Sequence, residues 1–400
     1  GLIDGDHNNW SPRLALAWKV PSKRSTIVRA GYGIYYNEQA YVQFTNILAQ
    51  QPPFATSNSV NTSPANVLIL DRGFATTTPR DITNNFAVAR DYRTPYASTW
   101  NASVQRDLPG GFFAEIGYLG TKGTRLDVRT LPNQQPPGAA LVTAARNQLG
   151  DAVGFTFDQS VGNSIFHSGH VRVVRRFNHG ISINAFYQYA KSIDDSSTFG
   201  GAGNTVAQNW LDISAERGLS SFDVRHQLST NFIWTSPVGG PGSSVSPDTK
   251  LGKLLKDWQL SGQLTAQTGN PLTARVLGNT QQLAQTGGVG RGRAEATGEP
   301  LDSPSSFFNL NAFTIPPVGA YGNAGRNTIP GPGLVNLNLA FARSFNLSER
   351  KRIEFRIESN NVLNHVNYTS YYTVVNAVTY GLPLAAGSMR TLDAVVRFRF

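Results

Sequence analysis

The 400-residue chain has no cysteine, and charged residues make up only 15% of it. Without cysteine, the chain cannot form disulfides, thiolate zinc sites or a thiol nucleophile, which suits a protein that crosses an oxidising compartment. The charged fraction lies well below the roughly 25% of an average soluble domain. No apolar run approaches the ~18 residues of a membrane-spanning helix. These absences exclude a disulfide-rich fold, thiol catalysis and a helical membrane domain.

The start of the chain also lacks the features of a targeting segment. GLIDGDHNNW has no basic start, no apolar stretch and no initiator methionine, since the single methionine is Met389. A signal peptide needs both a basic region and an apolar region. We therefore expect the chain to be a fragment or a cut domain, with any signal peptide upstream.

The net charge of +10 could indicate a polyanion partner, nucleic acid or an anionic membrane surface. However, the basic residues are spread along the chain and mostly alternate with acidic or apolar residues. Nucleic-acid binding usually needs a clustered basic surface. We therefore predict no nucleic-acid partner.

Segments in which apolar and polar residues alternate recur along the whole chain, whereas helical periodicity over a dozen residues does not. They cover residues 13–20, 26–36, 99–108, 112–120, 170–177, 181–190, 227–234, 258–267, 334–345, 351–359 and 392–400. Several are joined by short turns such as PSKRS, LPGG and FNHG, which is typical of antiparallel hairpins. The pattern predicts an all-β fold of about eleven strands in a single domain over residues 1–400.

The connections between these segments alternate in length. Short turns alternate with long segments rich in Gly, Pro, Asn, Gln and Ser, which cover residues 37–95, 121–168, 191–222, 268–333 and 361–390. One connection, SPVGGPGSSVSPDTKLGKLLKD, is of intermediate length on the short side. Outer-membrane barrels have short periplasmic turns and long extracellular loops, whereas soluble sandwiches rarely place every long loop at one end. We therefore predict an antiparallel transmembrane β-barrel, with a soluble β-sandwich or propeller as the alternative.

Aromatic residues gather near the ends of the expected strands. At the short-turn side they are Trp18, Phe112, Trp234, Trp258, Phe345 and Phe398, and at the long-loop side Tyr35, Tyr36, Trp100, Tyr118, Tyr187 and Tyr189. Membrane barrels carry an aromatic girdle at each interface of the bilayer. The two groups therefore favour the membrane barrel over the soluble alternative.

Several stretches resemble the barrel portion of TonB-dependent outer-membrane receptors of the Oar-like kind. They include TPYASTWNASVQRDLPGGFFAEIGYLGTKGTRL, FYQYAKSIDDSS, SSFDVRHQLSTNFIW, FFNLNAFTIPPVGAYGNAGRNTIPGPGLVNLNLAFARSFNL and ERKRIEFRIESNNVLNHVNY. The resemblance runs from about Asn9 to Phe400, and GNAGRN and NNVLNHVNY are its most specific pieces. It implies a location in the cell outer membrane, contact with outer-membrane lipid and energy from the TonB system.

The chain departs from this family at its start, because it shows no TonB box, no plug and no carboxypeptidase-regulatory-like domain. Plugged outer-membrane transporters have about 22 strands. Neighbouring barrel strands run in opposite directions, so if the last of eleven strands runs toward the periplasm, the first one does too. RLALAWKV is followed by a short turn, as expected of a strand that runs toward the periplasm. We therefore expect the C-terminal half of a 22-stranded barrel, which is not a functional pore alone because open sheet edges are not tolerated in lipid.

Charged side chains on the polar faces of the strands are expected to face the lumen. They are Arg172, Arg352, Glu354, Arg356, Glu358, Asp393, Arg397 and Arg399. Arg175 and Arg176 are candidates for the same face. These arginines could favour anionic cargo, or they could form a solvated ladder paired with Glu354, Glu358 and Asp393, and both interpretations stay open.

The final segment, LDAVVRFRF, alternates apolar and charged residues, with only Val395 breaking the pattern. An aromatic terminus resembles the signal by which the barrel assembly machinery recognises outer-membrane proteins. Phe398 and Phe400 are therefore the expected assembly signal, and the segment is the expected closing strand.

No motif predicts an enzyme, a metal or a cofactor. His167 and His170 lie three apart, so in a strand they point to opposite faces and cannot share an ion. Asp194 and Asp195 are more readily explained as capping a strand at the outer rim than as binding calcium. GGVGRGR, Gly287–Arg293, lacks the strand and helix of a phosphate-binding loop and is expected to be flexible extracellular loop. HExxH and GxSxG motifs are absent.

The favoured function is the barrel part of a TonB-dependent receptor that takes up a bulky solute. A passive pore or a surface adhesin is the first alternative, and an upstream plug and TonB box would distinguish the receptor from either. An outer-membrane hydrolase is the second alternative, and it would need an acid, a base and a serine facing each other at the barrel rim.

Overall fold

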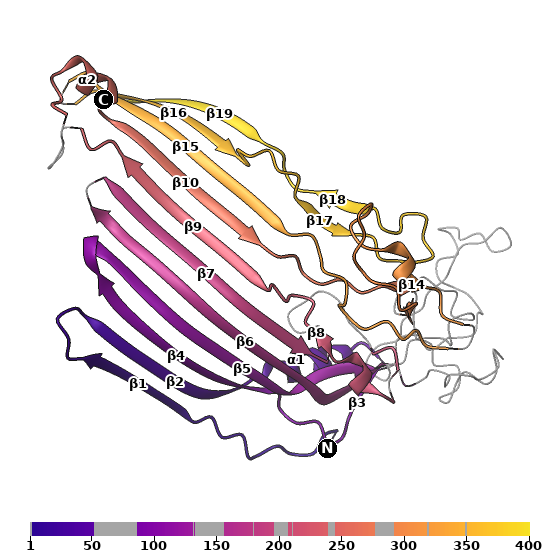
Figure 1. Ribbon diagram of the computed structural model, residues 1–400. Coiled ribbons are helices and arrows are strands. Elements are labelled where there is room, and N and C mark those ends of the chain that lie inside the picture. Colours follow the sequence, from indigo (N-terminus) through magenta and orange to yellow (C-terminus); the bar gives the residue numbers. More distant parts are fainter. Residues whose placement is uncertain are drawn as a thin grey trace, which may run out of the picture.

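The computed structural model describes residues 2–51, 86–130, 132, 156–178, 180–195, 207–209, 211–238, 245–276, 292–317, 320–348 and 350–400. Eleven antiparallel strands form the continuous path of a curved, 13-stranded sheet, in the order β1-β2-β4-β5-β6-β7-β9-β10-β15-β16-β19 (Figure 1). Their bounds are β1 Arg13–Val20, β2 Thr26–Tyr36, β4 Tyr96–Leu108, β5 Phe112–Thr130, β6 Thr156–Asn178, β7 Ile181–Asp194, β9 His226–Thr235, β10 Trp258–Gln267, β15 Leu334–Asn346, β16 Arg352–Asn360 and β19 Thr391–Arg399. Each is a segment that the alternating pattern predicts.

Short connections join the strands at one end of the sheet and long connections join them at the other, as the sequence predicts (Figure 1). We call these the turn end and the loop end. The connection between β9 and β10 contains the short helix α2, Lys250–Leu255, at the turn end. Both β1 and β19 run toward the turn end, which is where the C-terminus lies.

The register gives the sheet one apolar face and one polar face. Ile183, Phe232, Gly262 and Leu339 lie opposite one another across four strands. One residue further along, an equally continuous row consists of Asn184, Asn231, Gln263 and Asn338. A one-residue slip would exchange the two rows, so the alternation fixes the register wherever one face is apolar.

Most of the predicted aromatic groups lie on the apolar face, but Tyr35 does not. Tyr36 and Tyr35 are neighbours in β2, so they point to opposite faces. Tyr32 shares the apolar face with Trp100, its cross-strand partner, which places Tyr35 on the polar face. There the guanidinium of Arg13 lies 4.6 Å from the centre of the Tyr35 ring.

Trp100 also shows why a glycine stands in the next strand. Gly120 lies directly opposite Trp100, and a Cβ atom added there would lie 2.3 Å from the indole ring. The indole therefore packs across the bare backbone of β5. Its Nε1 donates to the Oη of Tyr118 at 3.4 Å.

The sheet is open in the described part of the chain. β1 pairs only with β2, and β19 pairs only with β16, and their side chains are exposed almost throughout. Unpaired strand edges are costly in lipid because their backbone groups find no partners there. Closure into a barrel of about 22 strands stays a prediction.

The expected loop at 121–168 is partly wrong, because β5 and β6 extend well into it. β5 has 19 residues and β6 has 23, whereas about 9–11 residues suffice to cross a bilayer. The alternation fails to reveal the extension because register shifts flank Leu126 and Arg125 adopts a φ of 56°. A bulge of this kind changes which face the next side chains occupy.

The loop end contains additional small elements and, among the described residues, nearly all of the buried apolar side chains. The elements are α1 Gln39–Leu48, β3 Phe86–Val88, β8 Gly218–Leu219, β11 Arg275–Val276, β12 Gly292–Arg293, β13 Glu295–Ala296, β14 Phe313–Thr314, β17 Tyr368–Tyr371 and β18 Pro383–Ala386. The main cluster, which we call the loop core, consists of Ala274, Val276, Ala294, Phe308, Ala312, Phe313, Ala324 and Ile329. Within the described ranges, no helix is both long and apolar enough to cross a membrane.

Candidate functional site at the loop end

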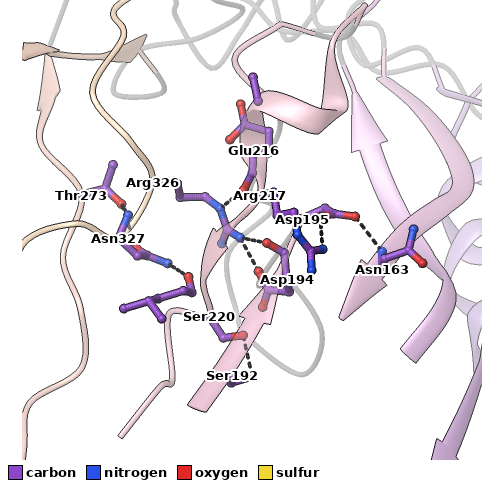
Figure 2. A network of polar contacts seen from close by, with 12 residues as sticks. Asn163, Ser192, Asp194, Asp195, Glu216, Arg217, Ser220, Thr273, Arg326 and Asn327 are labelled. Carbon is purple, nitrogen blue, oxygen red and sulfur yellow. Dashed lines mark hydrogen bonds and ion pairs between the residues drawn. The ribbon is translucent and has the colours of Figure 1, made fainter. Parts of the chain in front are cut away.

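Arg326, from the GNAGRN motif, is the centre of a buried polar network at the loop end (Figure 2). Its guanidinium forms an ion pair with Asp194, at the end of β7, and donates to the backbone oxygen of Asp194. Its Nε donates to the backbone oxygen of Glu216 at 2.7 Å. Two residues more than a hundred positions away are thus tied to this motif by one side chain.

The neighbouring Asn327 extends the same connection. It adopts a φ of 56°, and its Nδ2 donates to the backbone oxygen of Leu219 at 2.6 Å. Its backbone N–H donates to the Oγ1 of Thr273 at 2.9 Å, and Thr273 in turn donates to the Oδ1 of Asn327 at 2.8 Å. Asparagine tolerates the left-handed conformation and supplies both a donor and an acceptor, which explains its place in the motif.

Arg293 corrects the expectation of a flexible loop at Gly287–Arg293. Residues 287–291 lie outside the described residues, but Gly292 and Arg293 form β12 and are buried. The guanidinium of Arg293 lies 3.5 Å from the Oε1 of Glu216 and donates to the backbone oxygen of Ala215 at 3.2 Å. Gln208 accepts a hydrogen bond from the Arg293 backbone N–H at 2.8 Å. This arginine therefore belongs to the same network as Arg326.

Asp194 and Asp195 are both engaged by arginine. Asp194 pairs with Arg326, and the Oδ1 of Asp195 accepts from Arg217 at 3.3 Å. The other oxygen of Asp195 accepts from the backbone N–H of Asn163 in β6 at 3.0 Å. Among the described residues, no group of three or more His, Cys, Asp and Glu could hold a metal ion. The two aspartates thus fix the rim of β6 and β7.

The second specific motif, NNVLNHVNY, ties the last long connection to β15. Asn361 has a φ of 48° and is buried; its backbone N–H donates to Asn338, and its side chain accepts from and donates to the backbone of His365. The side chain of Asn367 pairs with both backbone groups of Val335, at 2.8 and 3.0 Å. The Asn367 side chain thus makes the two hydrogen bonds to Val335 that the backbone of a neighbouring strand would make.

A cavity of about 770 Å³, which we call the mouth cavity, lies beside these anchored segments. Gln267 and Leu334, which line it, belong to the polar face at the ends of β10 and β15. The lining also includes the aromatic and polar residues Asn270, Arg275, Tyr368, Tyr371 and Tyr372. Phe307 stacks on Tyr371 with ring centres 4.0 Å apart, which holds that ring in place. The volume is within the range of about 300–1,000 Å³ of small-molecule sites.

A separate buried cluster joins the first long connection to the extensions of β5 and β6. The Oη of Tyr92 donates to Asp127 at 3.1 Å, and Arg129 pairs with Asp158 at 2.8 Å. Burial and the neighbouring Asp158 carboxylate raise the pKa of Asp127 to about 6. Burial, followed by the charge of Asp127, also raises the pKa of Tyr92. Asp127 lies fifteen residues beyond Phe112 in β5, and Asp158 lies near the loop-end start of β6, so both are outside the stretches that cross a bilayer.

The charges predicted to face the lumen occupy the polar face of the sheet, and the register shows which of them lie opposite one another. In the register of β16 and β19, Arg352 lies opposite Arg399, Glu354 opposite Arg397 and Glu358 opposite Asp393. Only the second of these joins opposite charges. The Nε of Arg356 instead lies 2.5 Å from the Oε1 of Glu358 on the same strand. The register therefore agrees with a paired ladder at Glu354 but not at Glu358 and Asp393, which lie opposite each other.

Two arginines of β6 lie on different faces. Arg172 is on the polar face, opposite Glu115, and donates to Asn184 at 3.3 Å. Arg175 lies on the apolar face, opposite Ile183, with its guanidinium 5.3 Å from the ring centre of Phe112. Residues three apart in a strand point to opposite sides, so the expectation that Arg175 lines the lumen is wrong.

The two histidines lie on opposite faces, as predicted. On the apolar face, the Nδ1 of His167 lies 2.7 Å from the Oη of Tyr118. On the polar face, the Nε2 of His170 lies 3.3 Å from the Oε1 of Glu115. The two rings are thus separated by the sheet and cannot coordinate one ion together.

The comparisons agree with this geometry. A model of the family described as "outer membrane beta barrel domain" matches residues 1–393. The chain therefore belongs to this family, and it is located in the outer membrane. The all-β outer-membrane barrel fold predicted from the sequence is confirmed. No curated protein matches the chain.

Among solved structures, the chain is similar to the outer membrane transporter YddB from Escherichia coli. The two are 13% identical over 98% of this chain and 41% of that one, with a TM-score of 0.55. A mutant of the ferric enterobactin receptor PfeA from Pseudomonas aeruginosa matches with 10% identity, 98% and 40% coverage and a TM-score of 0.47. The chain thus spans about two fifths of the length of these proteins. The likeness to YddB establishes a shared fold, which agrees with the resemblance to outer-membrane receptors.

Proposed function

We propose that this chain is part of the barrel of a TonB-dependent receptor that takes up a bulky solute across the outer membrane. Family membership and the fold shared with an outer-membrane transporter support the proposal. The main observation in support of the proposal is the mouth cavity, because it provides space for a solute on the polar face of the sheet at the loop end. The reaction is translocation, and no bond is made or broken in the cargo.

The chemistry of the mouth cavity indicates which solutes it accommodates. Arg275 is exposed, and its guanidinium has no ion-pair partner within the described part of the chain. Its backbone is fixed by hydrogen bonds with Thr373 and Val375, at 2.9 and 2.8 Å. A fixed cation beside tyrosine rings suits a bulky solute with anionic and planar groups. The polar-face arginines, including Arg352, Arg397 and Arg399, would favour the same charge along the lumen.

Binding experiments with the full-length protein test the capture site. The purified protein is screened by thermal stability against iron chelates, oligosaccharides and peptides. A ligand found in the screen should bind roughly tenfold more weakly to the variant Arg275→Gln, because a charge-assisted hydrogen bond is worth about 1.5–3 kcal/mol. The matched control is Arg350→Gln at the turn end, which should bind like the wild type. Equal binding by both variants would remove the mouth cavity from the proposal.

Conductance separates the receptor from a passive pore. Full-length protein reconstituted in a planar lipid bilayer should show no large steady current, because a receptor of this class is plugged. The purified periplasmic domain of TonB should bind the same protein. A steady open conductance without TonB binding would instead favour the pore.

We also propose that Phe398 and Phe400 are the signal read by the barrel assembly machinery. Both rings lie at the turn end of β19, stacked with centres 5.8 Å apart, and Phe400 is 93% exposed. Deleting Phe400 from the full-length protein should lower its amount in the outer membrane, measured by heat-modifiable migration. Deleting Gly387, in the last long connection, is the control for an equally short deletion. Unchanged levels without Phe400 would refute the role.

A further inference from the structure

A second cavity, of about 620 Å³, shares Gln267, Gly269, Pro271 and Asn327 with the mouth cavity, and its other strand residues lie on the opposite face of the sheet. We call it the outer cavity. Its floor consists of Tyr187, Leu228, Ala266 and Val335, and Pro271 and Pro330 belong to the loops that cover it. The floor residues lie opposite one another across β7, β9, β10 and β15. The lining is predominantly apolar.

The register places the outer cavity on the apolar face of the sheet. Leu228 and Ala266 are paired across β9 and β10, and they lie on the same side of their strands as Phe232 and Leu264. The next residues along, Gln227 and Gln267, are paired on the polar face. Because the chain is located in the outer membrane, the apolar face of its sheet is in contact with lipid.

The outer cavity lies at the level of the aromatic group near the loop end. The Oη of Tyr187 lies 2.8 Å from the Nδ1 of His226, and the Tyr189 and His226 rings are 5.1 Å apart. Tyrosine rings of this kind mark the height of the lipid head groups. The floor residues Leu228, Ala266 and Val335 lie in register with Tyr187, so the apolar floor of the cavity lies at that height and the other lining residues lie toward the loop end.

A cation stands at the edge of the outer cavity. The guanidinium of Arg225 lies 6.0 Å from the centre of the Tyr189 ring and pairs with Asp223 at 3.2 Å. Its side chain is 27% exposed. Apart from the bond to Asp223, its N–H groups have no hydrogen-bond partner in the described part of the chain. They can therefore donate to an anion at head-group height.

The covering loops are fixed before any ligand binds. Leu272 and Ile329 exchange backbone hydrogen bonds at 2.7 and 3.0 Å, and Asn327 holds Thr273 through its side chain. A cavity that is already formed binds a flexible chain at a lower entropic cost than a loop that must first become ordered. Elsewhere on the apolar face, a lipid acyl chain contacts the protein on one side only. In the outer cavity, the loops would also cover the acyl chain from outside.

We propose that the outer cavity is a binding site for one acyl chain of an anionic outer-leaflet lipid, with Arg225 at its phosphate. The lipid that surrounds this face supplies the chain, and the volume is within the range of about 300–1,000 Å³ of ligand sites. Asp223 offsets part of the charge of Arg225, so the preference for an anionic head group is modest. Shape provides most of the retention.

Native mass spectrometry of the full-length protein in detergent tests the proposal, with dimyristoyl phosphatidic acid as the probe. Wild type should retain one lipid, and Ala266→Phe should bind it at least about tenfold more weakly, because the ring occupies the floor. Val335→Phe obstructs the same floor from the neighbouring strand. It provides a second test of the site if Ala266→Phe fails to fold. Ala185→Phe, on the same face of β7 but not among the residues that line the cavity, is the matched control and should bind like the wild type.

The head-group contact has its own comparison. Wild type should prefer dimyristoyl phosphatidic acid to dimyristoyl phosphatidylcholine, and Arg225→Gln should reduce that preference. The control is Arg106→Gln, which removes an exposed cation at the turn end, far from the outer cavity, and should leave the preference unchanged. Equal lipid retention by the wild type and both floor variants would overturn the site, as would complete displacement of the lipid by inorganic phosphate.

Discussion

The sheet and the loop end of this molecule are stabilised in different ways. Large apolar side chains of the sheet stay exposed, as with Ile116 at 64% and Phe355 at 49%. In the loop core, Ala274, Val276 and Ile329 are 0% exposed. The sheet is therefore held by its backbone hydrogen bonds and needs lipid against its apolar face, whereas the loop end has a core of its own, like a small soluble domain.

The difference also applies to polar groups. At the loop end, ion pairs such as Arg326 with Asp194 are buried. On the polar face of the sheet, the side chains of the ion pair Arg356 and Glu358 are 37% and 42% exposed. Buried charges become costly when one partner is lost, whereas exposed pairs contribute little. Substitutions should therefore have larger effects at the loop end than in the sheet.

The largest effect is expected for Arg326→Ala. The change leaves the buried Asp194 carboxylate without its cation, which typically costs about 3–5 kcal/mol. The long connections at 195–225 and 268–333 should become sensitive to protease while heat-modifiable migration of the barrel is retained. Arg217→Ala is the matched control, because the Arg217 side chain that pairs with Asp195 is half exposed, and its loss should cost about 1 kcal/mol or less. Equal protease sensitivity in both variants would contradict the comparison.

Two truncations compare the two regions directly. Ile329→Ala opens a cavity in the loop core and should destabilise that region by about 2–5 kcal/mol. Leu264→Ala removes a similar side chain from the apolar face of β10, where lipid tails fill the space, and should cost less than about 1 kcal/mol. Hydrogen exchange of the backbone amides around each site measures the difference. A larger effect at Leu264 would show that the sheet depends on close side-chain packing.

The buried cluster at Asp127 predicts a pH dependence. Its folded-state pKa of about 6 lies above the ordinary value of 3.8. Between these values the folded form binds more protons, so the stabilisation present below about pH 4 is lost as the pH rises through 6, on the order of 3 kcal/mol. Protection of Phe86–Tyr92 from hydrogen exchange should fall over this window. In Asp127→Asn, this protection should depend much less on pH, with the remaining dependence due to Asp158, whose pKa is also raised by burial. An unchanged pH dependence in this variant would show that another group is responsible.

The smallest effect is expected at Asp393. It lies directly opposite Glu358 between β16 and β19, and like charges at this position repel. Asp393→Asn should stabilise the barrel by a few tenths of a kcal/mol, measured as the temperature of heat-modifiable unfolding at low salt. High salt should abolish the gain, since exposed charges are screened. Destabilisation by this change would mean that Asp393 has an attractive partner in the complete barrel.

The sequence predicts the sheet far better than the loop end. The bounds of β1, β2 and β10 agree with the alternating segments to the residue, because a period of two is a local property. The extensions of β5 and β6 were missed because the bulge at Arg125 interrupts that period. GNAGRN and NNVLNHVNY were found as specific motifs, but their roles depend on partners more than twenty residues away.

By itself, the sequence determined most of the strands, the face that most of their residues occupy and the membrane environment, because strand periodicity and connection lengths can be read along the chain. The tertiary structure decided that Arg293 and Arg326 belong to one buried network, that Glu358 lies opposite Asp393, and that cavities lie on both sides of the same strand ends. These features require residues from distant segments to meet. The alternation of apolar and polar residues cannot predict such contacts, because they depend on the strand register and the packing of the loops in the folded protein.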